Sequence, residues 1–490
     1  MSFNHFPSRL LLFVIFGTTA SSCSAPVPEP SIEEVFSNIN QEVLQNGRAY
    51  LNLNKATATI GHRLTGSENG KQAEELAASL LRSYGMEKVE FFEFEVDAWM
   101  RESISLTIPG DSGDYDVDVV SLAHSPLDIE MEDTVIFAGS GLKEDFERLG
   151  IAVAGQIVLM NLGLEASDKG KPNLHRSEKT ALAVSHGATG VILINHVDGH
   201  VLLTGTASVT GELLAIPAMC VTNEEGAVLR KKLEEEQVVV KVEMKNQSKP
   251  IKARNVIGTI PGRELAQEKI VIGGHLDSWD LATGAIDNGV GSFTIIDIAR
   301  TFKALSLNGK RTIQFILFMG EEQGLLGSTA LVEHWVAANE IQNVRCMINL
   351  DMSSNAVGFN AFGREEMQPV LDSVGALIQQ VDSTYLNTNT NGVGLHSDHQ
   401  PFLLEGVPIL SMKSNMPGSV YRCYHSSCDD FDLVEKEHLV NGTRFTAMLL
   451  YALANMESIP AKQFDSGQTR QFLEDAGLKE KLVLGKDWKW

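Results

Sequence analysis

Metal-binding side chains are concentrated in four short segments of this chain. The first, IVIGGHLDSWDLATGAIDNGVG, covers residues 270–291, and the later ones read FILFMGEEQG, CMINLDMSS and YHSSCDD. Together they contain His275, Asp277, Asp287, Glu321, Glu322, Asp351 and His425. Imidazole and carboxylate groups suit zinc, and a catalytic zinc site keeps one position open for water. These residues therefore indicate two zinc ions per chain and an activated water.

Five of these side chains have an expected place in a two-metal site. Asp287 can bridge both ions because a carboxylate has two oxygen atoms. His275 and Asp351 would complete one metal site, and Glu322 and His425 would complete the other. Zinc lowers the pKa of bound water towards about 7, so a hydroxide that bridges the two ions would be available at physiological pH.

Two other carboxylates have expected roles in catalysis rather than in metal binding. Glu321 is next to a ligand, which makes it the natural general base that passes a proton from water to a leaving amine. Asp277 lies two residues after His275 and is expected to accept the ring N–H that does not face the metal, which would fix the tautomer. Asp398 and His399, in HSDHQPF, either line the substrate pocket or polarise the scissile carbonyl, or they are ordinary surface groups, and neither is counted as a ligand.

The elements that must position these residues are short apolar strands. Strands are expected at 270–274, 312–319, 344–350 and 407–412, with a helix at 291–305 between them. This alternation predicts an α/β fold with a sheet covered on both faces by helices. In open α/β sheets, ligands bind at the carboxyl ends of the strands, where His275, Glu321 and Asp351 would meet. Any one of these residues alone could be a turn residue, a helix cap or a surface charge. Their coincidence at one sheet edge favours a site.

The motif order resembles that of the family M28 zinc peptidases. The resemblance rests on HLDSWD with GAIDNGVG, EEQG, NLDM and YHSSCDD, and on IGHRLTGSENGKQAEELAASLLRSYGMEKV before them, and it spans roughly residues 40–455. It implies a zinc exopeptidase fold with a mixed, largely parallel sheet, the ligand set given above and Glu321 as the base. It also implies a cis peptide bond after Asp287 and a homodimer.

The middle of the chain changes character, because residues 122–249 carry no metal-type cluster. Short apolar strands and helical patterns alternate there and resemble a smaller, inserted protease-associated domain, expected to form a wall of the site or a simple spacer. The expected division of the whole chain is a targeting segment at 1–25, peptidase segments at 30–121 and 250–460, the insert at 122–249 and a polar, helical tail at 461–490.

The N-terminus has the pattern of a targeting segment, with Arg9 before an apolar run and small residues after it. Two outcomes are open, namely lipidation of Cys23 with attachment to a membrane, or ordinary cleavage near Ala25. Either predicts a secreted, periplasmic or cell-envelope protein.

Cys423 and Cys428 flank His425 and either pair in an oxidising compartment or stay free. The formal charge of -23 argues against nucleic-acid binding.

The function expected from the residues and the resemblance is an exopeptidase that cleaves short peptides or dipeptides. The alternatives are an aminopeptidase that acts on longer peptides and a catalytically silent, M28-like binding protein. Glutaminyl cyclases share the fold class but lack the inserted domain. Retention of all the ligand types together with Glu321 favours an enzyme.

Overall fold

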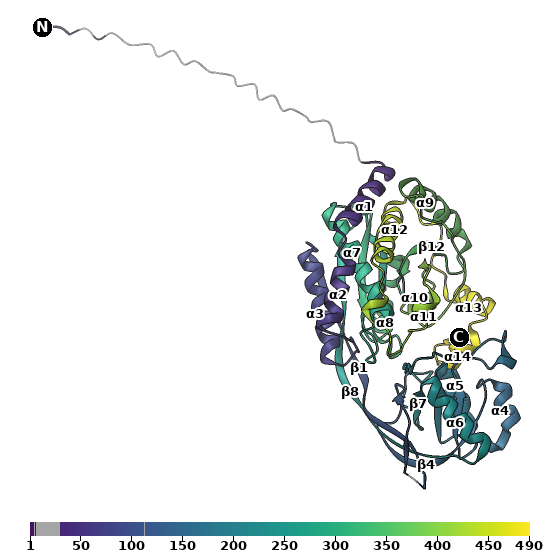
Figure 1. The fold of residues 1–490 in the computed structure, drawn as a ribbon. Coiled ribbons are helices and arrows are strands. Elements are labelled where there is room, and N and C mark those ends of the chain that lie inside the picture. Colours follow the sequence, from purple (N-terminus) through teal and green to yellow (C-terminus); the bar gives the residue numbers. More distant parts are fainter. Residues whose placement is uncertain (4, 6–29, 112) are drawn as a thin grey trace.

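The apolar runs of the sequence form neighbouring strands of one sheet in a computed structural model, which describes residues 1–3, 5, 30–111 and 113–490 (Figure 1). Its peptidase part has the strand order β12-β13-β11-β9-β10-β8. The central strands run parallel, and β12 and β8 pair antiparallel at the two sides. Their bounds are β8 Val239–Ile260, β9 Leu265–His275, β10 Arg311–Phe318, β11 Val344–Asn349, β12 Ala356–Asn360 and β13 Ile409–Ser414. The expected mixed, largely parallel sheet is confirmed.

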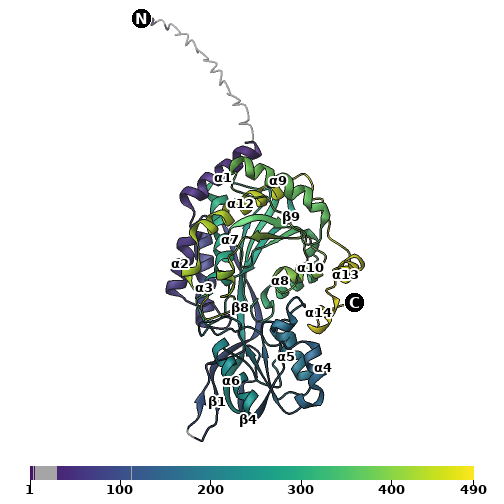
Figure 2. The same ribbon diagram turned by 45° about the vertical axis from the view of Figure 1, so that its right-hand side comes forward.

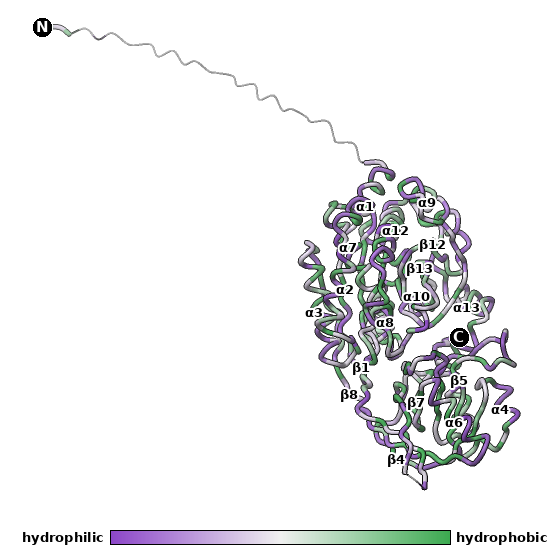
Figure 3. The backbone as a smooth tube through the Cα atoms, viewed as in Figure 1, coloured by the Kyte–Doolittle hydropathy of each residue, from purple (hydrophilic) through white to green (hydrophobic). Residues whose placement is uncertain are grey.

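Both faces of this sheet are buried. Ile270 and Ile272 of β9 pack into one apolar cluster, whereas Val271 between them packs into another. Successive side chains of a strand point to opposite faces, so a continuous apolar run needs cover on both sides. Figure 3 shows the hydrophobic strands inside this covering of helices.

The two faces are covered by different helices. One face packs against helices α1 Ile32–Asn46, α2 Ala49–Thr59, α3 Glu68–Ser83, α7 Val290–Ala304, α9 Gln368–Val381 and α12 Lys436–Asn455. The other packs against α8 Leu326–Ala337, α10 His399–Leu404, α13 Ser466–Asp475 and α14 Lys479–Leu484. A further short helix, α11, spans Gly418–Tyr421 just before His425. Within the described residues, no helix combines the length and the apolar character that a membrane span requires.

A long antiparallel pair carries the chain from the peptidase part to a second, smaller unit. Strand β1, Lys88–Ile108, pairs with β8 from Lys88 to Thr107, and the expected boundary at residues 249 and 250 falls inside β8. The smaller unit continues the sheet through β4 Asp128–Phe137, β5 Ile157–Asn161, β6 Gly190–Ile194, β7 Ala218–Val221 and β3 Val119–Ser121, with β2 Tyr115–Asp116 paired to β1. Its helices are α4 Lys143–Leu149, α5 Arg176–Ser185 and α6 Asn223–Glu235.

The C-terminal segment is helical, as expected, but it does not hang free. In Figures 1 and 2 the C-terminus and α14 lie between the peptidase part and the smaller unit. Leu473, Leu478 and Leu482 of this segment are buried in the same apolar cluster as β10 and α8. The tail is therefore part of the fold at the junction of the two units.

Candidate active site

Metal-type side chains from four segments converge at the carboxyl edge of the central strands. His275 is the last residue of β9, Glu321 and Glu322 follow β10, and Asp351 follows β11. Asp287 lies in the turn before α7, and His425 follows α11. The turn after β10 requires Gly320, whose φ of 81° an L side chain rarely adopts.

The two oxygens of Asp287 face two different histidines. Oδ1 lies 3.2 Å from His275 Nε2, and Oδ2 lies 3.2 Å from His425 Nε2. Asp351 Oδ1 is 3.3 Å from the same nitrogen of His275, and Glu322 Oε2 is 3.0 Å from that of His425. The five residues thus form two three-residue groups that share Asp287.

This donor set fits zinc. Ligand atoms bound tetrahedrally at zinc bond lengths of about 2.0–2.1 Å lie about 3.3 Å apart, which is close to these separations. His275, Asp287 and Glu322 also offer ligand atoms that all lie within 4.8 Å of one another. Both carboxylate oxygens of Glu322 are buried and accept no hydrogen bond of normal geometry among the described residues. Buried charges without donors are costly, and a cation would stabilise them.

The charges of the site shift its pKa values in opposite directions. Burial would lower the pKa of His275, but the nearby carboxylates of Glu321 and Asp351 raise it well above its usual range. Burial would raise the pKa of Asp287, but hydrogen bonds from both histidines hold it below its usual range. Burial raises the pKa of Glu321 well above its ordinary value, and the neighbouring carboxylates add to this effect. A carboxyl group whose pKa is raised in this way suits a general base.

The peptide bond between Asp287 and Asn288 is cis, as the family resemblance implies. The Asn288 side chain connects the segments that carry the site. Its amide donates to the carbonyl oxygens of His275 at 3.2 Å and Leu350 at 2.8 Å, and its oxygen accepts from Met352 N at 3.0 Å. This side chain therefore holds three functional segments at fixed spacing.

The expected contact between the Asp277 carboxylate and the His275 ring is corrected by the structure. The Asp277 backbone oxygen lies 3.1 Å from His275 Nδ1, whereas carboxylate Oδ1 is 3.7 Å away. That carboxylate instead accepts hydrogen bonds from Thr65 Oγ1 at 3.0 Å and Glu321 N at 3.3 Å. A backbone carbonyl fixes the tautomer as well as a carboxylate does, so Asp277 positions the segment that carries Glu321.

Asp398 and His399 are both buried, so neither is a surface group. His399 lines the site cavity, donates from Nε2 to Gly394 O at 3.0 Å, and has its pKa lowered to about 4 by burial. Asp398 does not line the cavity, and burial raises its pKa to about 8. The pocket interpretation therefore fits the position of His399 but not that of Asp398.

Sequence reasoning missed Arg63, which is fully buried and fixes the loop between His275 and Asp287. Its guanidinium donates to Leu276 O at 2.6 Å and to the Thr283 and Gly284 oxygens at 2.8 Å. Arg63 lies within the segment IGHRLTG on which the family resemblance partly rests, so that motif was the available signal.

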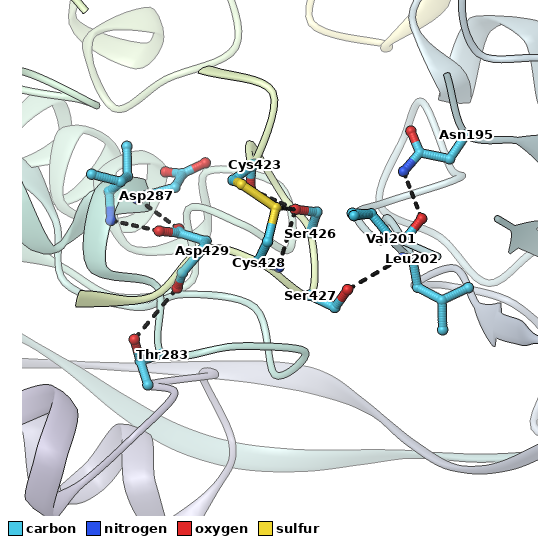
Figure 4. Close-up of a disulfide and its surroundings, with 11 residues drawn as sticks. Asn195, Val201, Leu202, Thr283, Asp287, Cys423, Ser426, Ser427, Cys428 and Asp429 are labelled. Atoms are coloured by element: carbon cyan, nitrogen blue, oxygen red, sulfur yellow. Dashed lines mark hydrogen bonds between the residues drawn. A yellow bond between two sulfur atoms is a disulfide. The ribbon is translucent and has the colours of Figure 1, made fainter. Parts of the chain in front are cut away.

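Asp429 was also missed, and it supports the same loop from the other side. Its carboxylate accepts backbone hydrogen bonds from Ile286 at 2.7 Å and Asp287 at 3.0 Å (Figure 4).

Cys423 and Cys428 form a disulfide across His425, so of the two alternatives, paired or free, the paired one holds. Cys220 and Cys346 are free and buried. Cys23 lies outside the described residues.

The smaller unit contacts this segment directly. Thr204 N donates to His425 O at 2.8 Å, and Ser427 N donates to Leu202 O at 2.9 Å. Leu203 and Ser426 form an antiparallel β-bridge. The segment that carries His425 is therefore shared by the two units.

A cavity of about 340 Å³ opens above the site. Its floor includes His275, Asp287, Glu321, Glu322 and His425, and the smaller unit contributes His175, Arg176 and Thr206 to its wall. The lining also includes the apolar residues Leu325, Met352, Phe362, Leu395 and Met412. A volume of this size is typical of a small-ligand site.

Arg176 is the third missed residue. It is 5% exposed and has no carboxylate partner among the described residues. It donates to Thr206 O at 3.1 Å, and its Nη2 atom lies 2.8 Å from His425 Nδ1. A Cβ atom at Gly205 would lie 2.0 Å from its guanidinium, so only glycine leaves room for it. A buried cation without a counter-ion at a cavity wall is suited to an anionic ligand.

A mixed sheet with two histidine–carboxylate groups at its carboxyl edge is the arrangement of a metal-dependent enzyme. Residues 255–450 match Peptidase family M28, and residues 122–229 match the PA domain. Over residues 255–450 the chain is therefore similar to peptidase family M28, and a PA-domain match precedes this part at residues 122–229.

Several curated proteins and solved structures are similar to this chain over most of its length. Carboxypeptidase Q of Bos taurus is 24% identical over 423 residues, which cover 84% of this chain and 86% of that protein. Aminopeptidase YwaD of Bacillus subtilis is 24% identical over 455 residues, which cover 91% and 92%. The crystal structure of a peptidase M28 precursor from Shewanella amazonensis has a TM-score of 0.76 at 22% identity and covers 88% of this chain and 99% of that one. The zinc aminopeptidase BSAP from Bacillus subtilis has a TM-score of 0.66 at 23% identity, covering 85% and 97%.

Proposed function

We propose that this chain is a secreted or cell-envelope di-zinc exopeptidase that hydrolyses dipeptides and other short peptides. The observation that carries this proposal is the pair of contacts that Asp287 makes with His275 and His425, one through each carboxylate oxygen. Asp351 and Glu322 would complete the two groups. The named relatives include a zinc aminopeptidase, which supports the choice of metal.

Zinc, when bound, would polarise the scissile carbonyl and lower the pKa of bound water, so that hydroxide is available to attack the carbonyl at neutral pH. Glu321 would accept the proton of the attacking water and deliver it to the leaving amine. Its position supports this role, because its backbone N–H is held by Asp277 while its side chain lines the cavity.

Arg176 supports an exopeptidase that recognises a free carboxylate. Its guanidinium lines the same cavity as Glu321 and lies next to His425. A peptide carboxylate bound there would receive a charge-assisted hydrogen bond in a site shielded from water. A C-terminal carboxylate so close to the metal ligands leaves room for few residues beyond the scissile bond.

Location outside the cytoplasm rests on one sequence pattern and one structural feature. The targeting pattern of residues 1–25 falls largely outside the described residues, so it remains a prediction. The Cys423–Cys428 disulfide is of the kind that persists in oxidising compartments.

The test compares a free dipeptide, its N-acetyl form, its C-terminal amide and a long peptide blocked at both ends. We expect cleavage of the free dipeptide and a loss of at least tenfold in kcat/KM for the amide. Arg176→Gln should raise KM for the free dipeptide and leave the slow cleavage of the amide unchanged. Efficient internal cleavage of the doubly blocked peptide would contradict the exopeptidase proposal. Selective loss on the N-acetyl form would favour the aminopeptidase alternative instead.

A further inference from the structure

A second chamber of about 140 Å³ adjoins the site cavity. The two spaces share part of their walls, including His175, Thr206, Leu325 and His396. The rings of His175 and His396 stack with centroids 5.8 Å apart and form the boundary between the two spaces. Arg176 lines the site cavity directly after His175, so a residue whose carboxylate pairs with Arg176 would lie next to this shared wall.

The chamber has walls from three parts of the chain. The PA domain contributes Ser177 and the loop 206–211, the peptidase part contributes Gln400, and the C-terminal segment contributes Lys481, Leu484 and Asp487. The Peptidase family M28 match ends at residue 450, so the C-terminal wall lies beyond it. The chamber is therefore a feature of this chain's assembled fold.

The PA-domain wall is held by its own hydroxyl groups. Thr206 Oγ1 accepts from Ser208 N at 3.2 Å, Ser208 Oγ accepts from Thr210 N at 3.3 Å, and Thr210 Oγ1 accepts from Glu212 N at 3.4 Å. Such local turns order a loop before any ligand arrives. They also leave the wall polar.

The C-terminal segment forms the far wall. Gln400 Nε2 donates to Asp487 Oδ2 at 2.9 Å, and Lys486 Nζ pairs with Glu212 at 2.7 Å. Leu482 of α14 is buried against the peptidase part, which anchors this wall. The extent of the chamber on this side is therefore set by the C-terminal segment.

The size of the chamber sets what it can hold. A cavity of about 150 Å³ accommodates a molecule of the size of benzene. The space thus fits one side chain and not a further stretch of peptide. Its lining combines hydroxyl and amide groups with leucine side chains and with Glu178, Lys481 and Asp487. Groups that both donate and accept hydrogen bonds are therefore available to an uncharged polar side chain.

We propose that this chamber is the subsite for the side chain of the residue whose carboxylate pairs with Arg176, and that the C-terminal segment sets the size of that residue. The proposal rests on the proposed function, because it places the carboxylate at Arg176. It predicts a preference for small or medium uncharged polar residues at that position. It also makes Leu484 a specificity-determining residue outside the catalytic machinery.

The test uses two neighbouring positions on α14. Leu484 is 41% exposed and lines the chamber, whereas Val483 is 54% exposed and does not. Leu484→Trp should lower kcat/KM for the zinc-loaded enzyme on Ala-Gln at least tenfold and leave Ala-Gly within twofold. Val483→Trp should leave both substrates within twofold, and Leu484→Ala should improve cleavage of dipeptides with a larger second residue.

Binding measured by calorimetry separates this proposal from the proposed function. Ala-Gln and Ala-Gly are titrated into Glu321→Gln protein, with and without Leu484→Trp. If Leu484→Trp selectively weakens Ala-Gln binding, the result supports the chamber as a side-chain subsite. Failure of the wild-type enzyme to cleave either dipeptide would overturn only the proposed function. Equal effects of Leu484→Trp and Val483→Trp on both dipeptides would overturn the assignment of the chamber as a side-chain subsite. A protein that binds neither dipeptide would also overturn it.

Discussion

Asp287 has two carboxylate oxygens, and each lies 3.2 Å from the Nε2 atom of a different histidine. The backbone around it is fixed from both sides, by Arg63 on the preceding loop and by Asp429 on its own N–H. Asn288, after the cis peptide bond, connects it to the ends of β9 and β11. At this scale the site is a preorganised set of ligand atoms whose supporting groups come from distant parts of the chain.

The residue-scale prediction concerns Glu321. Glu321→Gln keeps the size of the side chain but removes its capacity to accept a proton. We expect kcat to fall by about 100-fold or more, with zinc content close to that of the wild type, because general base catalysis typically contributes this much. Glu322→Gln is the matched contrast, since the neighbouring residue is an expected ligand and its variant should lose zinc. Activity of Glu321→Gln within a few-fold of wild type would remove Glu321 from this role.

The ligand types could be predicted from sequence because each follows an apolar strand or lies in a recognisable motif. The supporting residues could not. Arg63 contacts loop oxygens more than 200 positions away, and it binds backbone carbonyls that carry no side-chain pattern. Asp429 lies in the DD pair of YHSSCDD, where nothing in the sequence distinguishes a backbone acceptor from a surface charge.

At the scale of elements, the parallel strands β9, β10 and β11 carry the site at one end and an ion-pair group at the other. Glu268 of β9 lies 2.7 Å from Arg311 of β10 and 3.2 Å from Arg345 of β11. Arg311 is buried and also donates to carbonyl oxygens after α12. This group therefore ties together the three strands whose opposite ends hold His275, Glu321 and Asp351.

The element-scale prediction follows from the pKa of Glu268. Burial would raise this pKa, but bonds from Arg311 and Arg345 bring it below its ordinary value. A carboxylate with a depressed folded-state pKa adds stability above its unfolded pKa of about 4.3, and this contribution is lost as the pH falls through the folded value. Glu268→Gln should therefore lower the free energy of unfolding by about 1–2 kcal/mol at pH 7 and by less below pH 4.

Denaturant unfolding at pH 7 and at pH 3.5 measures this difference. Glu93→Gln is the control, because Glu93 is exposed on β1 and should change little at either pH. An equal destabilisation by Glu268→Gln at both pH values would contradict the charge-based account.

The strands of the peptidase part were predictable because their apolar runs are continuous and end where the polar motifs begin. The expected division at residues 249 and 250 falls inside β8, because β8 pairs with β1 over a length that spans both units, and such long-range pairing has no local sequence signal. The tail was expected to be helical and polar. Its place against the second chamber depends on packing between α14, the PA domain and the peptidase part, which local sequence does not encode.

At the scale of the whole molecule, the two units meet at the segment that carries His425. Its Cys423–Cys428 disulfide, its β-bridge to Leu203 and the hydrogen bond from Arg176 all lie within a few residues of that ligand. Asp429 in the same segment supports Asp287. The PA domain is therefore a structural part of the site wall, in agreement with the wall rather than the spacer interpretation of the insert.

If Asp287 organises two zinc ions, the zinc content of purified protein depends on this side chain, and it is measured after equilibration with zinc and removal of the free metal. We expect about two zinc ions per wild-type chain, about one for His425→Ala, and marked loss at both sites for Asp287→Ala. A chelator should inactivate the wild type, and added zinc should restore it. A wild-type chain that holds no zinc, or an Asp287→Ala chain that keeps two ions, would contradict the account.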